Sequence, residues 1–183
     1  MIKIFENYHL DELTGVGITC GNNVCISNDV ILSNPHNIII GSNVRIDAHS
    51  ILIAGPDTKI IIGNNVHIAA GCFLFGSDGN IIFEDFSGIS SRVTIYTASD
   101  DYVDGYMTNP TVDERFKKIH RGDVILKKNT IVGSSSVILP GVTLEFATSV
   151  GAQSLVKKSS NPFDILVGSP AKFIKKRKNV YLQ

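Results

Sequence analysis

The chain has no tryptophan, only two methionines, three cysteines and no net charge. Its 17 basic residues are balanced by 17 acidic ones, so no overall charge attracts it to nucleic acid. Cys20, Cys25 and Cys72 are odd in number and lack a zinc-ligand spacing, so we predict reduced thiols and a cytoplasmic location. No run of about 18 apolar residues occurs, and no membrane span is therefore expected.

What the chain does contain is a six-residue rhythm of branched or large apolar residues. A helix repeats every 3.6 residues and a strand every 2, so a period of six matches neither. It predicts a short extended segment and a corner, repeated about three times per coil of a solenoid. The positions are Ile40, Ile46, Leu52, Ile62, Ile68, Leu74, Phe83, Ile89, Ile95, Leu126, Val132, Ile138, Leu144, Val150 and Val156.

We predict one all-β domain over residues 1–183, with the shape of a triangular prism. Each coil alone leaves its apolar face exposed, so several coils must stack, and the ends need caps. The expected parts are an N-terminal cap (1–15), β-helix turns (16–100), an inserted loop (101–124), further turns (125–160) and a C-terminal tail (161–183). The tail could form a short helix after Pro170.

The insert is the one long stretch in which the rhythm is lost, and structureless segments of this length in compact domains are usually functional or disordered. Its acids, amide and aromatic rings are typical of carbohydrate sites, because hydroxyl groups need polar partners and sugar rings pack on aromatic faces. The candidate substrate-binding residues are Tyr102, Asp104, Tyr106 and Asn109.

Three runs carry a family resemblance: VILKKNTIVGSSSVILPGVTL, VGAQSLVKKSS and ILVGSPAKFIKKRKN. They resemble the hexapeptide-repeat acyltransferases, and within them the sugar O-acetyltransferases of the maltose, galactoside and surface-polysaccharide type. The resemblance covers roughly residues 16–178. It implies a left-handed parallel β-helix, a homotrimer, and acetyl-CoA as the co-substrate. The insert would then reach over a neighbouring subunit and form a wall of the acceptor pocket.

The resemblance also implies where coenzyme A lies, in a groove between subunits lined by small residues and ending at cations. The alternative is that tight corners need the small residues and that the lysines form a solvated basic tail. The positions that match the family pattern are Gly133, Ser134, Gly151, Ala152, Ser154, Lys157, Lys158, Lys172 and Lys175.

One departure from the family concerns the general base. Maltose-type enzymes end the motif Ile-Tyr-Thr-Ala-Thr-His with the catalytic histidine, whereas Asp100 stands at that position here. Asp100 and the adjacent Asp101 are therefore catalytic candidates, with an Asx turn at the mouth of the loop as the alternative. His67 is expected to point outwards and to meet Asp100 across a subunit contact, or to be a surface histidine without a chemical role. His120, at the end of the insert, is a further candidate.

A metal site is not expected. Carbonic anhydrases of this fold hold zinc through three histidines, two of which are separated by four residues, and no such pair occurs here. His49 and His67 stand at different places of their rungs, so they should not stack.

The resemblance implies transfer of an acetyl group from acetyl-CoA to a sugar hydroxyl, in surface-polysaccharide biosynthesis. Transfer should be direct, in a ternary complex, because no cysteine or serine stands in a nucleophile setting. The first alternative is N-acylation of an amino sugar nucleotide, since an amine acceptor needs less help from a base. The second is a non-catalytic β-helix that serves as a scaffold or a binding protein.

Overall fold

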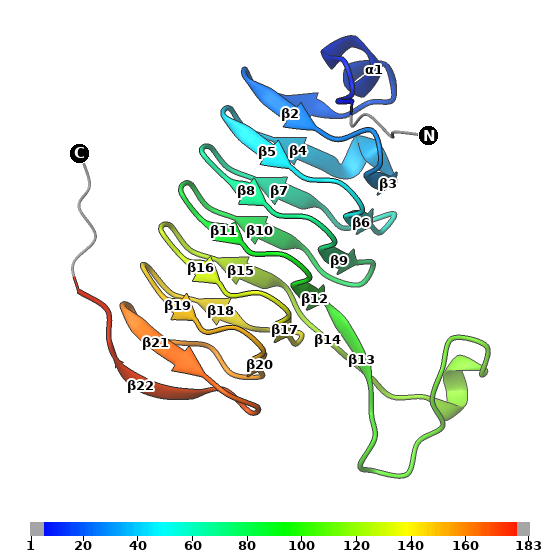
Figure 1. Ribbon diagram of the computed structural model, residues 1–183. Helices are drawn as coiled ribbons and strands as arrows, with labels where there is room; N and C mark the ends of the chain where they lie inside the picture. Colours follow the sequence, from blue (N-terminus) through cyan, green and yellow to red (C-terminus); the bar gives the residue numbers. More distant parts are fainter. Residues whose placement is uncertain (1–5, 179–183) are drawn as a thin grey trace, which may run out of the picture.

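The computed structural model describes residues 6–178, and the chain forms a solenoid of short parallel strands (Figure 1). Residues 1–5 of the predicted cap and 179–183 of the predicted tail lie outside the described residues. The first sheet contains β1 (Thr19–Cys20), β4 (Ile38–Ile40), β7 (Ile60–Ile62), β10 (Ile81–Phe83), β15 (Val124–Leu126) and β18 (Thr143–Leu144). The second contains β2 (Val24–Ile26), β5 (Val44–Ile46), β8 (His67–Ile68), β11 (Gly88–Ile89), β16 (Ile131–Val132), β19 (Ser149–Val150), β21 (Asp164–Val167) and β22 (Lys172–Lys176). The third contains β3 (Ile31–Ser33), β6 (Ile51–Ala54), β9 (Phe73–Gly76), β12 (Thr94–Tyr96), β17 (Val137–Ile138) and β20 (Leu155–Val156).

The six-residue rhythm forms the core, and the predicted fold class is confirmed. Each rhythmic residue lies directly above its equivalent in the next coil, as Ile68 does between Ile46 and Ile89 in the second sheet. All of these side chains are at most 4 % exposed. Burying one such side chain contributes roughly 1.5–3 kcal/mol, so the stacked ladders stabilise the solenoid along its whole length.

The corners use residues that accept a left-handed backbone. Asn23, Asn43 and Asn65 have φ values of 55°, 58° and 56° at the corner that follows the first sheet. Asparagine tolerates this conformation better than branched residues do. The side-chain amide of Asn23 also donates to Asn43 Oδ1 at 2.9 Å, so successive corners are linked.

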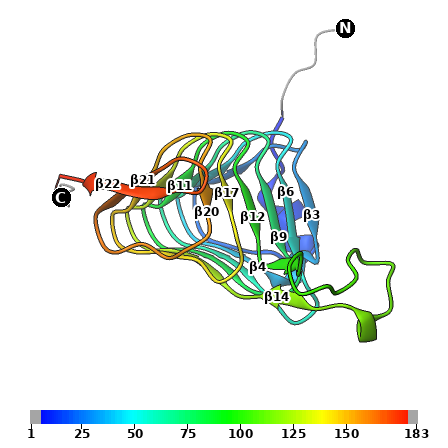
Figure 2. The same cartoon turned by 90° about the horizontal axis from the view of Figure 1, so that it is seen from below.

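The insert is a folded arm that leaves the corner between the third and first sheets. It starts on β13 (Ala98–Asp100), contains a 3₁₀ turn (Glu114–Phe116) and returns on β14 (Ile119–Arg121), antiparallel to β13. The coil resumes in unbroken register, with Phe83 of β10 paired to Leu126 of β15. Figure 2, which looks along the solenoid, shows the arm projecting from one corner.

The two ends of the solenoid are closed differently. At the N-terminal end, the helix α1 (Leu10–Gly15) buries Leu13 in the core, and a 3₁₀ turn (Pro35–Asn37) follows β3. At the C-terminal end, the helix allowed after Pro170 is wrong, because the chain folds back as β22 (Lys172–Lys176), antiparallel to β21. This pairing satisfies the open edge of the second sheet, which a helix would leave bare. None of the helices in residues 6–178 has the length and apolar character required to span a membrane.

Candidate active site

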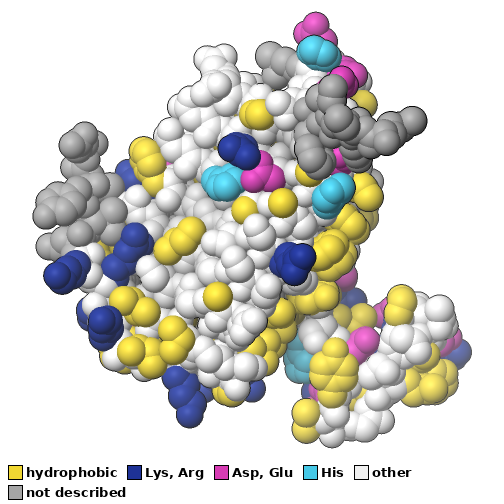
Figure 3. Space-filling model, in the orientation of Figure 1, with side chains coloured by type: hydrophobic (Ala, Val, Ile, Leu, Met, Phe, Trp, Pro, Cys, Tyr) yellow, Lys and Arg dark blue, Asp and Glu magenta, His cyan; other side chains and the backbone are white. Residues whose placement is uncertain are grey.

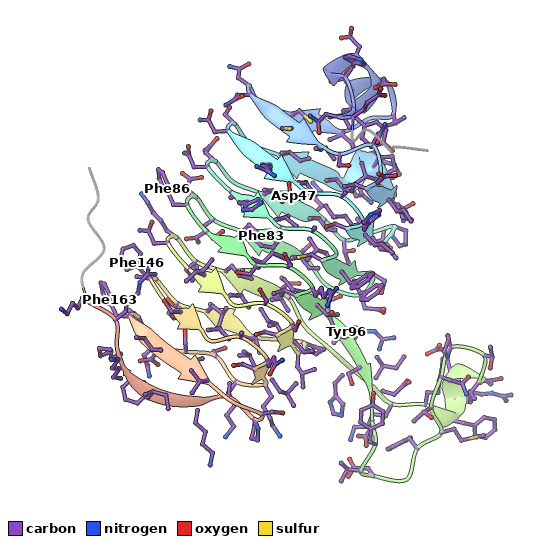
Figure 4. All side chains as sticks on the ribbon, in the orientation of Figure 1. Asp47, Phe83, Phe86, Tyr96, Phe146 and Phe163 are labelled. Atoms are coloured by element: carbon purple, nitrogen blue, oxygen red, sulfur yellow. The ribbon has the colours of Figure 1, made fainter. Side chains whose placement is uncertain are left out.

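A cavity of about 640 Å³ lies where the arm joins the solenoid. Both parts contribute to its wall, so the site exists only because the arm is folded against the body. Tyr96 of β12, labelled in Figure 4, lies at this junction. The wall consists of Asp78, Tyr96, Ala98, Ser99, Asp100, Tyr102, Pro110, Glu114, Lys117, Ile119, Arg121 and Leu139.

The cavity contains both signs of charge. Arg121 donates from Nε to Asp78 Oδ1 at 2.8 Å, and this hydrogen bond lowers the pKa of Asp78 below its ordinary value. Lys117 has a side chain only 3 % exposed, and its ammonium group contacts Glu114 at 2.7 Å. A lysine is rarely buried unless it is paired. Two cations that are each held by one acid provide a place where an anionic ligand can exchange with the carboxylates.

Asp100 lines this cavity, as a catalytic or substrate-binding residue would. Its Oδ2 accepts a hydrogen bond from the backbone amide of Asn109 at 3.1 Å, which ties the outgoing strand to the loop of the arm. Asp100 therefore shares the cavity wall with two further acids, Asp78 and Glu114, and its catalytic role stays a prediction.

Asp101, the second acid of the pair, has a different environment. Its Oδ1 accepts the backbone amides of Val103 and Asp104, both at 2.8 Å, so it forms the Asx turn considered as the alternative to catalysis. These hydrogen bonds, that from Asp104 first, hold the pKa of Asp101 well below its ordinary range. Its side chain is 2 % exposed. A buried carboxylate with these partners is a structural anchor.

The four predicted substrate-binding residues are not brought together. Tyr102 lines the cavity beside Asp100. Asp104 contacts the ammonium group of Lys118 at 2.5 Å, and the same group lies 5.5 Å from the ring centre of Tyr106. Asn109 Oδ1 accepts a hydrogen bond from the Thr111 hydroxyl at 2.6 Å. Of the four, only Tyr102 is in a position to touch a ligand in this cavity.

Sequence reasoning missed several residues of the cavity wall, chiefly Asp78, Glu114, Lys117 and Arg121. The sequence nevertheless contained a pattern that could have indicated them. Residues 77–82 and 101–123 both interrupt the rhythm at the same corner, one coil apart, so their side chains had to be neighbours. The hydrogen bond between Arg121 and Asp78 joins these two interruptions.

His67 points outwards from the second sheet, as predicted, but it already has a partner within the chain. Its Nε2 lies 2.8 Å from Asp47 Oδ2, and Arg45 donates to Asp47 Oδ1 at 2.6 Å. Burial works to raise the pKa of Asp47, but the hydrogen bonds from His67 and Arg45 outweigh it and lower the pKa. In Figure 3 a basic, an acidic and a histidine side chain lie together in the upper part of this face. Within the chain, His67 and Asp100 do not meet.

The positions expected to hold coenzyme A follow the corner between the second and third sheets. Ser134 lines a cavity of about 520 Å³ there, together with His49 and Arg92. Gly133 and Gly151 are required by close packing, since a Cβ on Gly133 would lie 2.5 Å from Ala152 N and one on Gly151 would lie 2.8 Å from Val167 Cγ1.

Ser154 is buried in this corner, whereas Ala152 is exposed. The Ser154 hydroxyl donates to Gly151 O at 2.7 Å and accepts from Gly168 N at 3.1 Å. The corner therefore has an internal need for Ser154, beside any contact with a ligand.

The predicted cations Lys157, Lys158, Lys172 and Lys175 are all exposed at the C-terminal end. Figure 3 shows basic side chains gathered there, around an apolar patch. Phe173 and Ile174, which are 53 % and 56 % exposed, lie on the same strand. Among the described residues, no group of three or more histidine, cysteine or acidic side chains is suited to hold a metal ion.

The fold and the cavity define a repeat-built β-helix with a polar ligand site at the foot of an arm. No family model matches the chain. It is 39 % identical over 178 residues to the dTDP-4-amino-4,6-dideoxy-D-glucose acyltransferase of Escherichia coli, covering 96 % of this chain and 92 % of that protein. The chain belongs to the same family, the hexapeptide-repeat acyltransferases, as the resemblance in its sequence indicated.

Solved structures agree with this assignment. An N-acyltransferase from Bacillus cereus, in complex with dTDP and 3-hydroxybutyryl-CoA, is 41 % identical with a TM-score of 0.88, over 94 % of this chain and 90 % of that chain. A maltose O-acetyltransferase from Clostridium difficile 630 is 21 % identical with a TM-score of 0.60, over 92 % and 74 % of the two chains. This second likeness concerns the fold alone.

Proposed function

We propose that the protein transfers an acyl group from an acyl-CoA to the amine of a dTDP-linked amino sugar. The observation that carries the proposal is the similarity, along almost the whole chain, to an acyltransferase of dTDP-4-amino-4,6-dideoxy-D-glucose. It favours the N-acylation alternative over transfer to a sugar hydroxyl. Asp100 in place of the base histidine supports the same choice, because a neutral amine is already a good nucleophile.

The reaction requires little from the protein beyond the correct orientation of the two substrates. The amine nitrogen attacks the thioester carbonyl, the carbon–sulfur bond breaks, and the amide and free coenzyme A are formed. The amine's extra proton must leave, and the carboxylate of Asp100 lies in the cavity wall where it can hold and accept that proton. Placing two bound substrates in contact supplies much of the remaining acceleration.

A serine–aspartate spacing found among variants of the B. cereus enzyme also occurs in this chain. One serine and one aspartate of that enzyme have been replaced in its crystal structures, and the aspartate follows the serine by ten positions. Here Ser90 and Asp100 have that spacing, as do Ser91 and Asp101.

The cavity suits a nucleotide sugar. Lys117 and Arg121 provide two cations for a diphosphate, whose oxygens would replace Glu114 and Asp78 as partners. Tyr96 and Tyr102 provide apolar faces for a base or a sugar ring. The released carboxylates can accept hydrogen bonds from sugar hydroxyls.

Coenzyme A would lie along the small-residue corner at Gly133, Ser134, Gly151 and Ala152, with its phosphates towards the C-terminal lysines. Structures of the similar B. cereus enzyme contain coenzyme A or an acyl-CoA. The acetyl group is the simplest acyl group to test first. The free thiols of the chain and the coenzyme A donor fit a cytoplasmic site of action, and the product fits surface-polysaccharide biosynthesis.

The proposed assembly is a homotrimer in which a neighbouring subunit completes the site. The arm exposes large apolar residues, with Tyr102 at 80 % and Val103 at 89 %. On the outer face of the third sheet, Phe75 stacks between Phe73 and Tyr96 at ring distances of 6.1 Å and 5.1 Å. Apolar surfaces of this kind are typical of subunit contacts. Light scattering on the purified protein tests the trimer.

The decisive experiment uses two acceptors that differ only in the reacting group. Release of free thiol from acetyl-CoA is measured with dTDP-4-amino-4,6-dideoxyglucose and with dTDP-6-deoxyglucose, which has a hydroxyl at the same carbon. We expect turnover with the amine to exceed turnover with the hydroxyl by at least 100-fold. Faster transfer to the hydroxyl would restore O-acetylation. No thiol release, together with no thermal stabilisation by millimolar coenzyme A, would favour a non-catalytic β-helix.

A further inference from the structure

The returning strand of the arm presents two chemically different faces. Lys117, Ile119 and Arg121 belong to the cavity wall. The residues between them, Lys118 and His120, both contact the carboxylate of Asp101. Side chains alternate along an extended chain. One face of the returning strand therefore lines the cavity, and the side chains of the other face contact Asp101 on the opposite side of the strand.

Asp101 is placed to hold that second face. Its Oδ2 lies 3.1 Å from both Lys118 Nζ and His120 Nε2, while its Oδ1 accepts two backbone amides of the outgoing chain. Its own amide donates to the carbonyl of Lys118 at 2.9 Å, which extends the pairing of β13 with β14 by one residue. A single buried side chain thus joins both strands at the foot of the arm.

We infer that Asp101 is a positioning residue of the acceptor site, which fixes the face that β14 turns to the cavity. A shift of one residue in strand register moves every side chain to the opposite face. Such a shift would remove Lys117 and Arg121 from the cavity and bring in Lys118 and His120. Holding Lys118 and His120 behind the strand prevents it.

The same contacts exclude Asp101 as the base. Its Oδ1 accepts two backbone amides, its Oδ2 contacts Lys118 Nζ and His120 Nε2, and its side chain is nearly buried. Its neighbours Asp100 and Tyr102 line the cavity, whereas Asp101 is absent from the wall described above. The nature of the ligand rests on the proposed function, but the role of Asp101 in the arm does not.

The test compares Asp101→Asn with Asp113→Asn. The control shares the arm and the kinds of contact, because Asp113 also accepts a backbone amide, that of Arg115 at 2.9 Å, and also pairs with a cation, but its side chain is 47 % exposed. Binding of dTDP by calorimetry, steady-state kinetics with acetyl-CoA, and hydrogen exchange of the β13 and β14 amides are measured for both variants and for the parent protein.

For Asp101→Asn we expect at least tenfold weaker dTDP binding, a similar rise in the acceptor KM, and less than threefold changes in kcat and in the acetyl-CoA KM. Exchange should be faster in β13 and β14 only, and adding Lys118→Met should cause little further loss. Asp113→Asn should resemble the parent protein. A fall in kcat at unchanged KM would assign Asp101 to the chemistry and overturn the inference.

The outcome also separates this inference from the proposed function. If the parent protein neither binds dTDP nor transfers an acyl group, the proposed function fails, and the exchange data still decide the role of Asp101. If the parent protein binds and reacts but Asp101→Asn has unchanged binding and unchanged exchange, the inference alone fails.

Discussion

The solenoid body and the arm are stabilised by different interactions. In the body, equivalent apolar side chains stack from coil to coil, and Ile62 lies between Ile40 and Phe83 as part of such a ladder. In the arm, a few polar contacts take the place of such ladders, centred on the buried carboxylate of Asp101 with Lys118 and His120. Large apolar side chains of the arm point into solvent instead of packing on one another.

The two regions therefore have different roles, since the body provides a rigid frame and the arm provides the polar groups of the cavity. The body supplies a frame whose positions repeat, and the arm supplies charged groups that occur once in the chain. The cavity lies at their boundary, and Tyr96 of the body lines it together with Tyr102 and Arg121 of the arm. Damage to the body should therefore lower stability, and damage to the arm should lower activity at constant stability.

The largest effect is expected in the body. Ile89→Ala removes a fully buried side chain from the middle of a ladder and should destabilise the fold by about 2–5 kcal/mol. Val103→Ala, an apolar truncation in the arm that removes one carbon fewer, should cost less than about 0.5 kcal/mol because Val103 is 89 % exposed. Urea unfolding followed by circular dichroism measures both. Equal losses would show that the arm is part of the cooperative core.

The next effect concerns the arm. Arg121→Met should lower kcat/KM for the nucleotide sugar by about 10–100-fold, as expected for the loss of a hydrogen bond to a charged phosphate worth about 1.5–3 kcal/mol. Stability should change by less than about 1 kcal/mol, since the ion pair with Asp78 is half exposed. Thiol-release kinetics and urea unfolding give the two numbers. An unchanged KM for the nucleotide sugar would place the diphosphate elsewhere.

The body was predictable from sequence because its signal is redundant. One apolar residue per rung is repeated through every coil, so a corner insertion at 56–61 or 77–82 does not hide the period. Each coil confirms the register of its neighbours, and the prediction of the core needed no knowledge of side-chain contacts. The C-terminal tail has no such redundancy. Its pairing as β22 depends on the open edge of β21, which the tail's own residues do not reveal.

The site was predictable only in part because its residues occur once. Asp100 was proposed from its place in a motif, and it lines the cavity. Asp101 next to it is instead buried behind the strand, and only the position of Lys118 and His120 shows why. The pairing of His67 with Asp47 joins successive coils across 20 positions and needed the exact register of β5 with β8. Neither the burial of Asp101 nor the pairing of His67 with Asp47 can be read from the spacing of neighbouring residues in the sequence.

A third prediction asks whether the body contributes a chemical group as well as a frame. His67 is held by Asp47 and points away from its own subunit. If His67 meets Asp100 across a subunit contact and shares its role in accepting the proton, His67→Ala should lower kcat by about tenfold. Asp47→Asn should cause a smaller loss, since it leaves the imidazole in place. The readout is kcat at saturating acetyl-CoA, and unchanged rates in both variants would leave His67 as a surface residue.

The smallest effect is expected at the C-terminal lysines. Lys172→Met with Lys175→Met should raise the KM for acetyl-CoA about threefold to tenfold, because exposed cations attract phosphates through solvent that screens them. Lys128→Met is the matched control, since its ammonium group lies 5.4 Å from the Phe86 ring centre, on another corner of the solenoid. The effect should shrink as salt is raised, and the acceptor KM should not move. An equal rise in the control would mean that general surface charge, and not a phosphate site on β22, attracts the donor.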